Sequence, residues 1–513
     1  MNAYKKGLDK MKTDRREFLK GTAWMGAAAI AAGCASKGMK LSVGGSMQGY
    51  RAPALSKVRV GFVGLGMRGP GAVHRIAAIP GAEVAALCDI YPERVAAQQQ
   101  WLAANGKPAA LEFTGPEGYK AMCESDAIDV VYNATSWDMH VPIALYAMEH
   151  GKHAMVEVPS AFTLEECWAL VETSERTKMH CMQLENCCYG EAEMLALNLV
   201  RSGLFGEVVH GEGAYIHDLR DLCYADWAPD FSQYGYADFW RLRWNVQHKG
   251  NQYDTHGLGP VCQYMNINRG DRFDYLVSLE SNQFNFEAYA KTKFPGHAWK
   301  ADLKIAMGDM NTMLIKTVNG KSIMVQHDVS SPRPYSRINR VTGTMGAFEG
   351  IGFMGKDASD FDKMNALQMD GCYGKFGWTD QPGGSVHGYF NEATMQAMRE
   401  KYRHPLWRPE ISDVAKAIGG HGGMDFIMDL RWVYCLQNGL PLDTDVYDLA
   451  SWCCLAELSE RSVKNRSNSV DVPDFTNGGW KTAAPLGIVD IDLVKMGFNP
   501  NTEVQADSSA LNV

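Results

Sequence analysis

Residues 58–69 read VRVGFVGLGMRG, and this stretch decides the fold. Its first half is a short β-branched run typical of a buried strand, and its second half is a GxGxxG motif that leads into a helical pattern over 70–79. Gly64 allows a tight turn, Gly66 lets the backbone approach a pyrophosphate, and Gly69 permits close packing of the helix on the strand. The stretch therefore predicts the start of a parallel α/β sheet that binds a dinucleotide at its first turn.

An acidic residue follows where such a sheet holds a ribose. Residues 83–88 form a second strand-like run, and Asp89 stands at its end, near the spacing of roughly 20 residues expected of a ribose-binding acid. A carboxylate there accepts hydrogen bonds from ribose hydroxyls and repels a 2′-phosphate, so we expect NAD rather than NADP. A Rossmann-like domain that has lost its cofactor is the alternative.

The composition limits the classes of partner. The chain has 513 residues, of which 46% are apolar and 21% charged, as in globular proteins of two or three domains. Asp and Glu (59) outnumber Lys and Arg (50), and no basic block is present, so we expect no nucleic-acid partner. The 13 cysteines form no CxxC pattern, which favours small buried side chains over a zinc or redox site, while disulfides stay open for an exported chain.

The N-terminus has the pattern of an export signal. Residues 13–20, TDRREFLK, resemble a twin-arginine signal, and the uncharged run 21–33 is too short to span a membrane but suits a signal peptide. Residues 31–34, AAGC, resemble a lipoprotein cleavage box that would leave Cys34 lipidated, with a simple signal-peptidase site as the alternative. We expect a protein exported by the twin-arginine route, periplasmic or lipid-anchored, whose only membrane contact is through Cys34.

The rest of the chain divides into regions with different patterns of predicted secondary structure. Strand-like and helix-like segments alternate at first, and strand-like runs dominate beyond residue 205. We predict a signal over 1–34, a linker over 35–56, an NAD-binding Rossmann domain over 57–186, a substrate-binding α/β domain over 187–470 and a C-terminal extension over 471–513. Ligands of open parallel sheets bind at the carboxyl ends of the strands. Residues that follow strand ends should therefore gather at one crevice; these are Trp137, Asp138, His140, Glu157 and Asn186.

Three motifs resemble the glucose–fructose oxidoreductase/inositol dehydrogenase (Gfo/Idh/MocA) family. They are the glycine turn 64–69, Ala134-Thr135 after a strand, and Glu157-x-Pro159. The resemblance implies a Rossmann domain followed by an α/β domain with a large, mostly antiparallel sheet. The family's motif has a lysine between Glu and Pro that helps proton transfer during hydride chemistry. Val158 stands there in this sequence and carries no proton, which argues against ordinary dehydrogenase activity.

A closer resemblance, over most of 57–465, is to family 109 of the glycoside hydrolases. It rests on VEVP at 156–159, ENCCY at 185–189, YIHDLR at 215–220, WRLR at 240–243 and YDTHGLGP at 253–260. The resemblance implies a retaining α-N-acetylgalactosaminidase whose partner is a small molecule or glycan with terminal N-acetylgalactosamine. One departure is Asp254, where we expect proline in relatives.

The resemblance also implies the site residues. Together with the glycines Gly64 and Gly69, the cofactor contacts are Gly66, Met67, Arg68, Asp89, Trp137, Asp138, Met139, His140, Glu157, Val158, Asn186, Tyr253, Asp254, Thr255, His256 and Gly257. The sugar contacts are Tyr215, Arg241, Tyr253 and Tyr335.

A glycosidase with NAD implies a redox route rather than the usual carboxylate pair, which the sequence leaves open. Oxidation at sugar C3 acidifies the C2 hydrogen, the C1 substituent leaves by elimination, water adds, and re-reduction completes the cycle. Export fits, because a cycle that regenerates NAD⁺ in place needs one tightly bound molecule. The alternatives are a Gfo/Idh/MocA-type sugar oxidoreductase with tightly bound NAD, and a non-catalytic carbohydrate-binding lipoprotein.

Three residues are candidates for proton transfer: His256, Tyr215 and Tyr189. For each, simple packing is the competing interpretation, and for Tyr189 it is the stronger one. Arg241 and Arg243 alternate with apolar residues and would share one face of a strand. No HExxH or carboxylate triad accompanies the histidines, so we expect no metal. The segment from His421 to Asp425 either reaches the cleft or only begins a helix, and homo-oligomerisation stays open.

Overall fold

The computed structural model describes residues 45–226, 235–297, 299–350, 365–369 and 390–497. The predicted export signal, Cys34 and residues 35–44 of the predicted linker lie outside these ranges, so the predictions of export and lipidation stay untested. No helix among the described residues is long and apolar enough to cross a membrane.

The first sheet has six parallel strands in the order β3-β2-β1-β4-β5-β6. Their bounds are β1 Val58–Val63, β2 Ala82–Asp89, β3 Leu111–Thr114, β4 Val130–Asn133, β5 His153–Val156 and β6 Cys181–Gln183. The connecting helices are α2 Gly69–Ala78, α3 Pro92–Ala104, α4 Gly118–Glu124, α5 Trp137–Glu149 and α6 Leu164–Thr177. The strand order reverses between β1 and β4, which is where a doubly wound sheet opens a crevice. The predicted Rossmann architecture is confirmed.

The second sheet has eight strands in the order β13-β12-β11-β7-β10-β9-β8-β14. Their bounds are β7 Val208–Ile216, β8 Phe273–Glu280, β9 Asn311–Thr317, β10 Ser322–Asp328, β11 Arg340–Gly343, β12 Gly346–Gly350, β13 Asn365–Met369 and β14 Val470–Asp471. Among the described strands of this sheet only β7 and β10 pair in parallel, so the sheet is mostly antiparallel as predicted.

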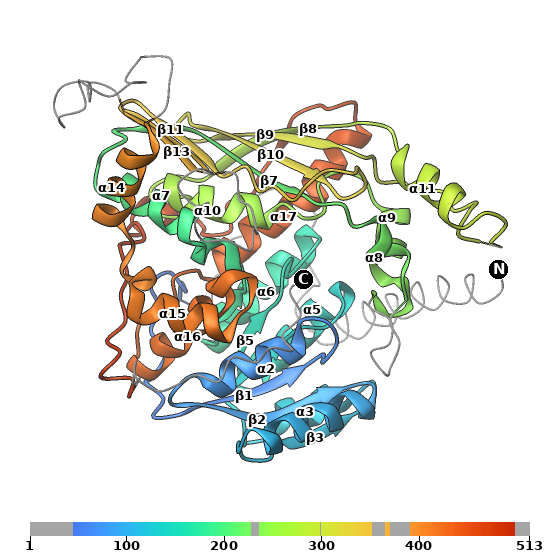
Figure 1. The fold of residues 1–513 in the computed structure, drawn as a ribbon, viewed down its shortest axis with the longest axis vertical. Helices are drawn as coiled ribbons and strands as arrows, with labels where there is room; N and C mark the ends of the chain where they lie inside the picture. The colour runs from blue at the N-terminus through green and yellow to red at the C-terminus, as the bar shows by residue number, and fades with distance from the viewer. Residues whose placement is uncertain (1–44, 227–234, 298, 351–364, 370–389, 498–513) are drawn as a thin grey trace, which may run out of the picture.

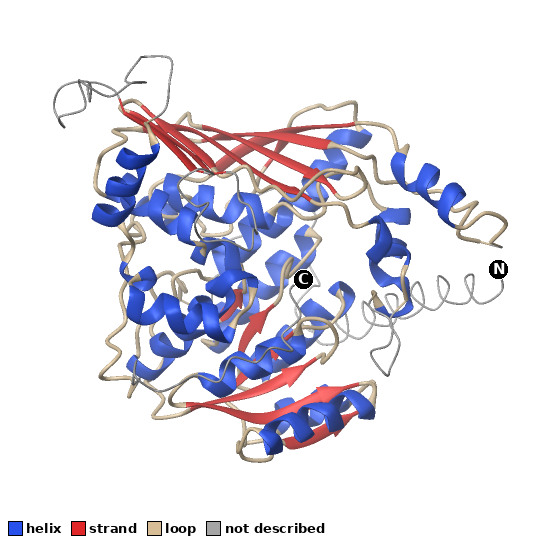
Figure 2. Ribbon diagram, in the orientation of Figure 1, coloured by secondary structure: helices blue, strands red, loops and turns tan. Residues whose placement is uncertain are grey.

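The helices after β6 are η1 Asn186–Tyr189, α7 Glu191–Arg201, α8 Arg220–Tyr224, η2 Ala237–Phe239, α9 Trp240–Gln247, α10 Thr255–Met265, α11 Asn285–Lys293, α14 Glu392–Tyr402, η4 Pro405–Trp407, α15 Pro409–Ile418, η5 His421–Gly423, α16 Met424–Asn438, α17 Val446–Lys464 and η6 Gly479–Lys481. Helices such as α7, α10 and α17 lie between the two sheets, whereas α11 and α14 lie at the edges of the molecule (Figures 1 and 2). α17 contacts α6 and β6 on one side and β8 on the other. One apolar core therefore runs from the first sheet into the second.

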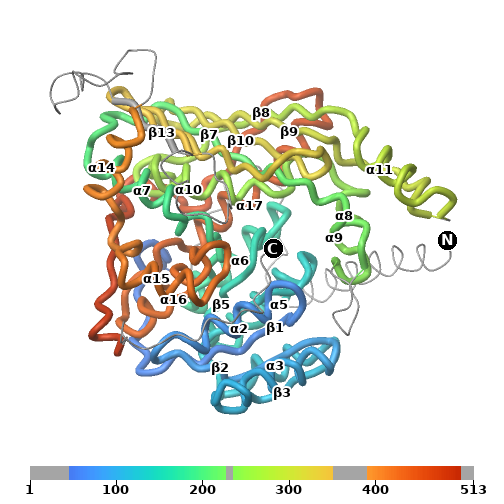
Figure 3. Tube along the Cα trace, viewed as in Figure 1, coloured from blue at the N-terminus to red at the C-terminus, as the bar shows by residue number. Residues whose placement is uncertain are grey.

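Late segments of the chain return to the first sheet. In the tube of Figure 3, α15 and α16, drawn in orange, lie beside the blue α2, and both helices contact α2. This return brings the first turn of α16 to the glycine turn that precedes α2.

Two expectations need correction or refinement, and one agrees with the structure. Residues 240–247 form α9 rather than a strand, so Arg241 and Arg243 do not share a face; Arg241 is buried, whereas the side chain of Arg243 is 20% exposed. The end of the predicted linker is packed, since Met47 is buried and Leu55 N donates to Leu436 O. All eleven described cysteines are buried and free, as expected of small hydrophobic side chains.

Candidate active site

The glycine turn between β1 and α2 is built for a close ligand. Gly64 has φ +89°, and a Cβ there would lie 2.6 Å from the carbonyl oxygen of Ala134. A Cβ on Gly69 would lie 2.1 Å from the carbonyl oxygen of Gly64. In the described chain no side chain caps the first turn of α2, so its N–H groups stay available to an anion. The cradle fits a dinucleotide pyrophosphate.

Asp89 lies beside this cradle at the end of β2. Its Oδ2 accepts hydrogen bonds from the backbone N–H of Leu65 (2.6 Å) and from Arg94 Nη1 (3.3 Å). The carboxylate is buried at the place the sequence predicts. Each carboxylate oxygen has two acceptor sites, so these bonds leave capacity for a ribose.

The carboxyl ends of β4 and β5 carry the next predicted residues. His140 is buried, and its Nδ1 and Nε2 lie 2.8 and 3.1 Å from the carbonyl oxygens of Pro159 and Thr135. His140 therefore connects the loop that follows β4 to the loop that follows β5. Trp137 is also buried, whereas Asp138 is exposed and Met139 half-buried.

Glu157 and Val158 form the wall after β5. Glu157 Oε1 accepts a hydrogen bond from Tyr132 Oη (3.2 Å) and lies 3.4 Å from Arg68 Nε. Val158 is 7% exposed and belongs to the hydrophobic cluster that also contains Trp137. The position of the wider family's lysine is thus an apolar surface in this chain.

A charged network joins the glycine turn to α16. Arg68 Nη2 lies 3.1 Å from Asp425 Oδ2, which His421 Nδ1 also approaches at 2.9 Å. Asn186 Nδ2 donates to Asp425 Oδ1 at 2.5 Å, and Arg75 Nη1 lies 3.6 Å away from Oδ2. Burial alone would raise the pKa of Asp425, but His421 and the two arginines outweigh it and hold that pKa well below its usual range. The segment from His421 to Asp425 therefore reaches Arg68 of the glycine turn.

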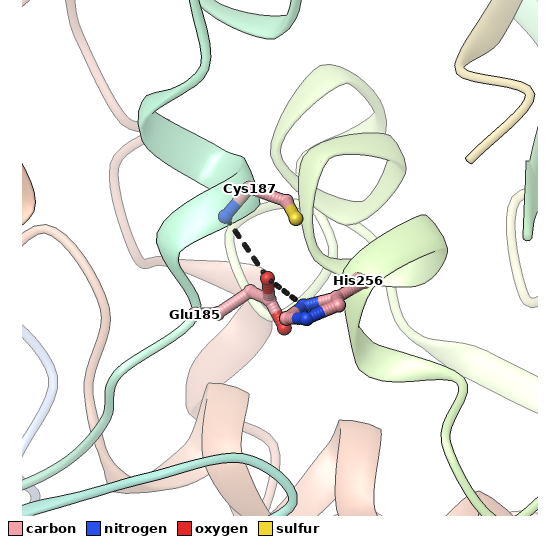
Figure 4. A group of neighbouring side chains, drawn as sticks. All are labelled: Glu185, Cys187 and His256. Atoms are coloured by element: carbon pink, nitrogen blue, oxygen red, sulfur yellow. Dashed lines mark hydrogen bonds and ion pairs between the residues drawn. The ribbon is translucent and has the colours of Figure 1, made fainter. Parts of the chain in front are cut away.

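Glu185 and His256 form a second histidine–carboxylate pair (Figure 4). Glu185 Oε1 accepts hydrogen bonds from His256 Nδ1 (2.7 Å) and from the backbone N–H of Cys187 (3.0 Å). The carboxylate partner assigns the proton of the neutral ring to Nδ1, which leaves Nε2 as an acceptor, 3.3 Å from Tyr253 Oη. Burial raises the pKa of Glu185, but the His256 charge and its hydrogen bond lower it overall, so Glu185 is ionised.

The same three side chains also have the spacing of a metal site. The ligand atoms of Glu185, Cys187 and His256 all lie within 4.8 Å of one another. His256 Nδ1 is already bonded to Glu185, so a carboxylate–histidine pair explains this geometry without an ion.

The predicted sugar contacts surround His256. The ring centroid of Tyr215, on β7, lies 4.5 Å from that of Tyr253 and 5.4 Å from that of His256. The guanidinium of Arg241 lies 5.0 Å from the ring centroid of Tyr253 and 5.9 Å from that of Tyr215. Tyr335 stands edge-on to Tyr215 at 6.0 Å. The structure therefore brings all four predicted sugar residues together.

These tyrosines remain protonated. Burial raises the pKa of Tyr215, and Arg241 opposes this rise without cancelling it. Burial also raises the pKa of Tyr253 well above its usual range. Both phenols are therefore hydrogen-bond donors at neutral pH rather than bases.

Tyr189 is not part of this group, and its prediction as a catalytic phenol is wrong. Its hydroxyl donates to Asp443 Oδ2 at 3.1 Å, and Asp443 pairs with Arg431. The side chain is 2% exposed and belongs to the main core. Burial and the Asp443 charge raise the pKa of Tyr189 well above its usual range.

Fewer side chains of the turn over residues 253–257 are placed to contact a ligand than the sequence predicts. Asp254 and Thr255 are at most 1% exposed, so their side chains face the interior. A Cβ on Gly257 would lie 2.1 Å from the backbone nitrogen of Ala214, which shows how closely α10 packs on β7. Of this turn, Tyr253 and His256 are the side chains left to meet a ligand.

Sequence reasoning named no role for Glu185 and left that of Asp425 open. A signal existed for Glu185, because it follows β6 directly at the carboxyl edge of the sheet. Asp425 is far from that sheet in the chain and gives no comparable signal.

The fold and site define a Rossmann-type, dinucleotide-binding protein with a second, mostly antiparallel α/β domain. Residues 58–184 match the family model described as "Oxidoreductase family, NAD-binding Rossmann fold", and residues 189–482 match "Glycosyl hydrolase 109, C-terminal domain". The chain belongs to glycosyl hydrolase family 109.

Individual relatives agree with this assignment. A glycosyl hydrolase family 109 protein of Porphyromonas gingivalis is 47% identical over 429 residues, covering 83% of this chain and 86% of that protein. An alpha-N-acetylgalactosaminidase of Shewanella oneidensis is 46% identical over 482 residues, covering 93% of this chain and 98% of that enzyme. Among solved structures, a levoglucosan dehydrogenase with NADH and L-sorbose shares the fold, with TM-score 0.59, 17% identity and coverage of 82% of this chain and all of that one.

Proposed function

We propose that the protein is a retaining α-N-acetylgalactosaminidase that uses one tightly bound NAD and consumes no net oxidant. The observation that carries the proposal is the position of His256. It is held by Glu185 at the edge of the dinucleotide sheet and faces Tyr215 and Tyr253 of the predicted sugar site. The identity of 46% to the Shewanella oneidensis alpha-N-acetylgalactosaminidase over 93% of the chain supports the substrate.

The cofactor would be held by the glycine turn, Asp89, Arg68 and Glu157. Bound NAD⁺ would supply the capacity to accept a hydride from sugar C3 and return it later. His256 Nε2 is the atom available to accept the proton of the C3 hydroxyl. The Glu185 carboxylate at Nδ1 stabilises the imidazolium that results.

A second proton acceptor is needed at C2, because the C3 ketone acidifies that hydrogen and elimination of the C1 group requires its removal. Two further histidines lie among the predicted site residues: His217 beside Tyr215, and His421 beside Arg68. Burial and the nearby Arg241 charge lower the pKa of His217 to about 4, which makes it a weak base. His421 is held by Asp425 beside Arg68 and Asn186, so we assign it to C2. Water then adds at C1, and the proton returns to C2.

The location of the protein completes the proposal. The sequence of the first 34 residues supports export by the twin-arginine route, a pathway for folded chains, with lipidation of Cys34. A folded chain can carry its NAD with it. A reaction that restores the cofactor each turn suits a compartment with little free NAD.

Product analysis tests this function. Protein purified without added NAD should release the nucleotide on denaturation and should convert an aryl α-N-acetylgalactosaminide into free sugar and phenol. An oxidised sugar would instead support a sugar oxidoreductase. Protein that stays inactive on the aryl glycoside when NAD is supplied would contradict the proposal.

A further inference from the structure

The segment from Tyr335 to Asn339 is held against β7 in an unusual conformation. Arg337 O accepts a hydrogen bond from Ala214 N at 2.7 Å, and Ser336 and Ile216 exchange two backbone bonds of 3.0 Å. Ile338 and Asn339 then adopt φ values of +62° and +51°, which non-glycine residues rarely do. Such backbone persists only where the surroundings over-determine it, which occurs most often at functional sites.

Arg337 and Glu193 form a buried ion pair beneath this segment. Arg337 is 5% and Glu193 2% exposed. Arg337 Nε and Nη2 both donate to Glu193 Oε1, at 3.0 and 2.7 Å. A Cβ on Gly190 would lie 2.1 Å from Glu193 Oε2, so the glycine leaves room for the carboxylate. Burying the Arg337–Glu193 ion pair costs more desolvation free energy than burying apolar side chains of the same volume. The stability of the fold alone therefore does not explain why this ion pair is present.

The remaining arm of the guanidinium points to Tyr335. Arg337 Nη1 donates to Tyr335 Oη at 3.3 Å. A guanidinium has donors and no acceptor, so the Tyr335 oxygen must accept this bond and its O–H must point elsewhere. The ring of Tyr335 stands edge-on to Tyr215 (6.0 Å) and His217 (5.2 Å), at the sugar side of the site.

We propose that Arg337, anchored by Glu193, is a positioning residue that makes Tyr335 a hydrogen-bond donor to the bound sugar. The inference rests on the proposed function, and it specifies one feature that the bound sugar must have. An acceptor oxygen of the sugar must face Tyr335, and the carbonyl oxygen of an acetamido group, which cannot donate, meets that requirement.

A double-mutant cycle tests whether Arg337 acts through Tyr335. Arg337→Lys keeps a cation beside Glu193 but loses the forked donors. Arg337→Lys and Tyr335→Phe should each lower kcat/KM for the aryl glycoside about tenfold, as the loss of one hydrogen bond does. The double variant should be no worse than either single one. Effects that multiply, or an Arg337→Lys enzyme with native kinetics and only a lower Tm, would overturn the proposal.

The chain offers a matched control away from the sugar site. Arg431, Asp443 and Tyr189 form a similar buried arginine–carboxylate–phenol group. Arg431→Lys and Tyr189→Phe should lower Tm without changing KM. If these variants changed KM as Arg337→Lys does, the effect would be general destabilisation and the proposal would fail.

Binding measurements separate this proposal from the proposed function. Calorimetric titration of the NAD-loaded protein with free N-acetylgalactosamine should show the same non-additive pattern in Kd. A protein that binds the sugar in this pattern but does not hydrolyse the glycoside contradicts the proposed function alone. Additive changes in Kd contradict the role of Arg337 whether or not hydrolysis occurs.

Discussion

His256 Nδ1 lies 2.7 Å from Glu185 Oε1, and this contact spans the two halves of the molecule. Glu185 follows the last strand of the parallel sheet, whereas His256 stands in the first turn of α10, which packs on β7 of the second sheet. The pair therefore fixes the imidazole of His256 between the edge of the parallel sheet and the rings of Tyr215 and Tyr253. The hydrogen bond between Glu185 and His256 therefore forms only when the two sheets keep their relative position.

Replacing Glu185 should impair catalysis more than binding. Glu185→Gln keeps the shape but removes the charge that stabilises the His256 imidazolium, so kcat should fall by roughly 10²- to 10⁴-fold with KM nearly unchanged. Steady-state kinetics and nucleotide content measure both effects. Cys187→Ser is the control, because the substitution leaves unchanged the backbone N–H of residue 187 that bonds Glu185, and it should retain activity. A chelator that abolished activity would instead favour a metal at these residues.

Cofactor retention should depend on one methyl-sized space in the glycine turn. Gly69→Ala places a Cβ 2.1 Å from the Gly64 carbonyl oxygen, so the turn must shift and NAD should be lost on purification. Gly71→Ala, in the same helix, meets only Arg75 Nη1 at 3.4 Å and should retain NAD. The absorbance of nucleotide released on denaturation compares the two. Equal retention would show that the turn does not hold the cofactor.

The link between Arg68 and Asp425 should appear in the pH dependence of stability. The folded-state pKa of Asp425 lies well below its usual range, so its contribution is present above the unfolded-state pKa and is lost as the pH falls through the folded-state value. Asp425→Asn leaves two arginines under-compensated and should cost about 3 kcal/mol near pH 7. Chemical denaturation from pH 7 downward should show the difference shrinking. A difference that does not change with pH would contradict an ionised Asp425.

Asp254 should have the opposite pH dependence. Its side chain is 1% exposed, Oδ2 has no hydrogen-bond partner in the described structure, and burial raises its pKa well above the usual range. The native state therefore loses stability as the pH rises above the unfolded-state value near 3.9, by about 1.4 kcal/mol per pH unit until the folded-state pKa is reached.

Asp254→Asn removes this titration, so the variant should gain stability relative to the native chain between pH 4 and pH 7. Urea unfolding at both pH values measures the gain. A native chain and variant with parallel pH profiles would show that Asp254 is solvated.

The sequence predicts those parts of the fold and site that are local in the chain. The glycine turn, Asp89 and the residues after each parallel strand were predictable because one βα unit specifies them. The period-2 pattern at 240–243 failed because tertiary packing made these residues helical, burying Arg241 among Tyr215, Tyr236 and Tyr253.

Contacts between segments that are far apart in the chain could not be predicted from the sequence. Asp425 meets Arg68 only because α16 folds back onto α2, and no periodicity encodes that return. Tyr189 matched a family motif, but its hydroxyl is turned toward Asp443 in the core. The direction in which a side chain points depends on tertiary packing, and a sequence motif does not specify that packing.

Deuterium incorporation tests the central claim most directly. The native protein is incubated with an aryl α-N-acetylgalactosaminide in deuterated water, and the released sugar is analysed by proton NMR. Removal and return of the C2 proton predicts deuterium at C2, with the C3 hydrogen retained because the same hydride leaves and comes back. Released sugar that keeps its C2 hydrogen would contradict elimination and would indicate direct displacement at C1.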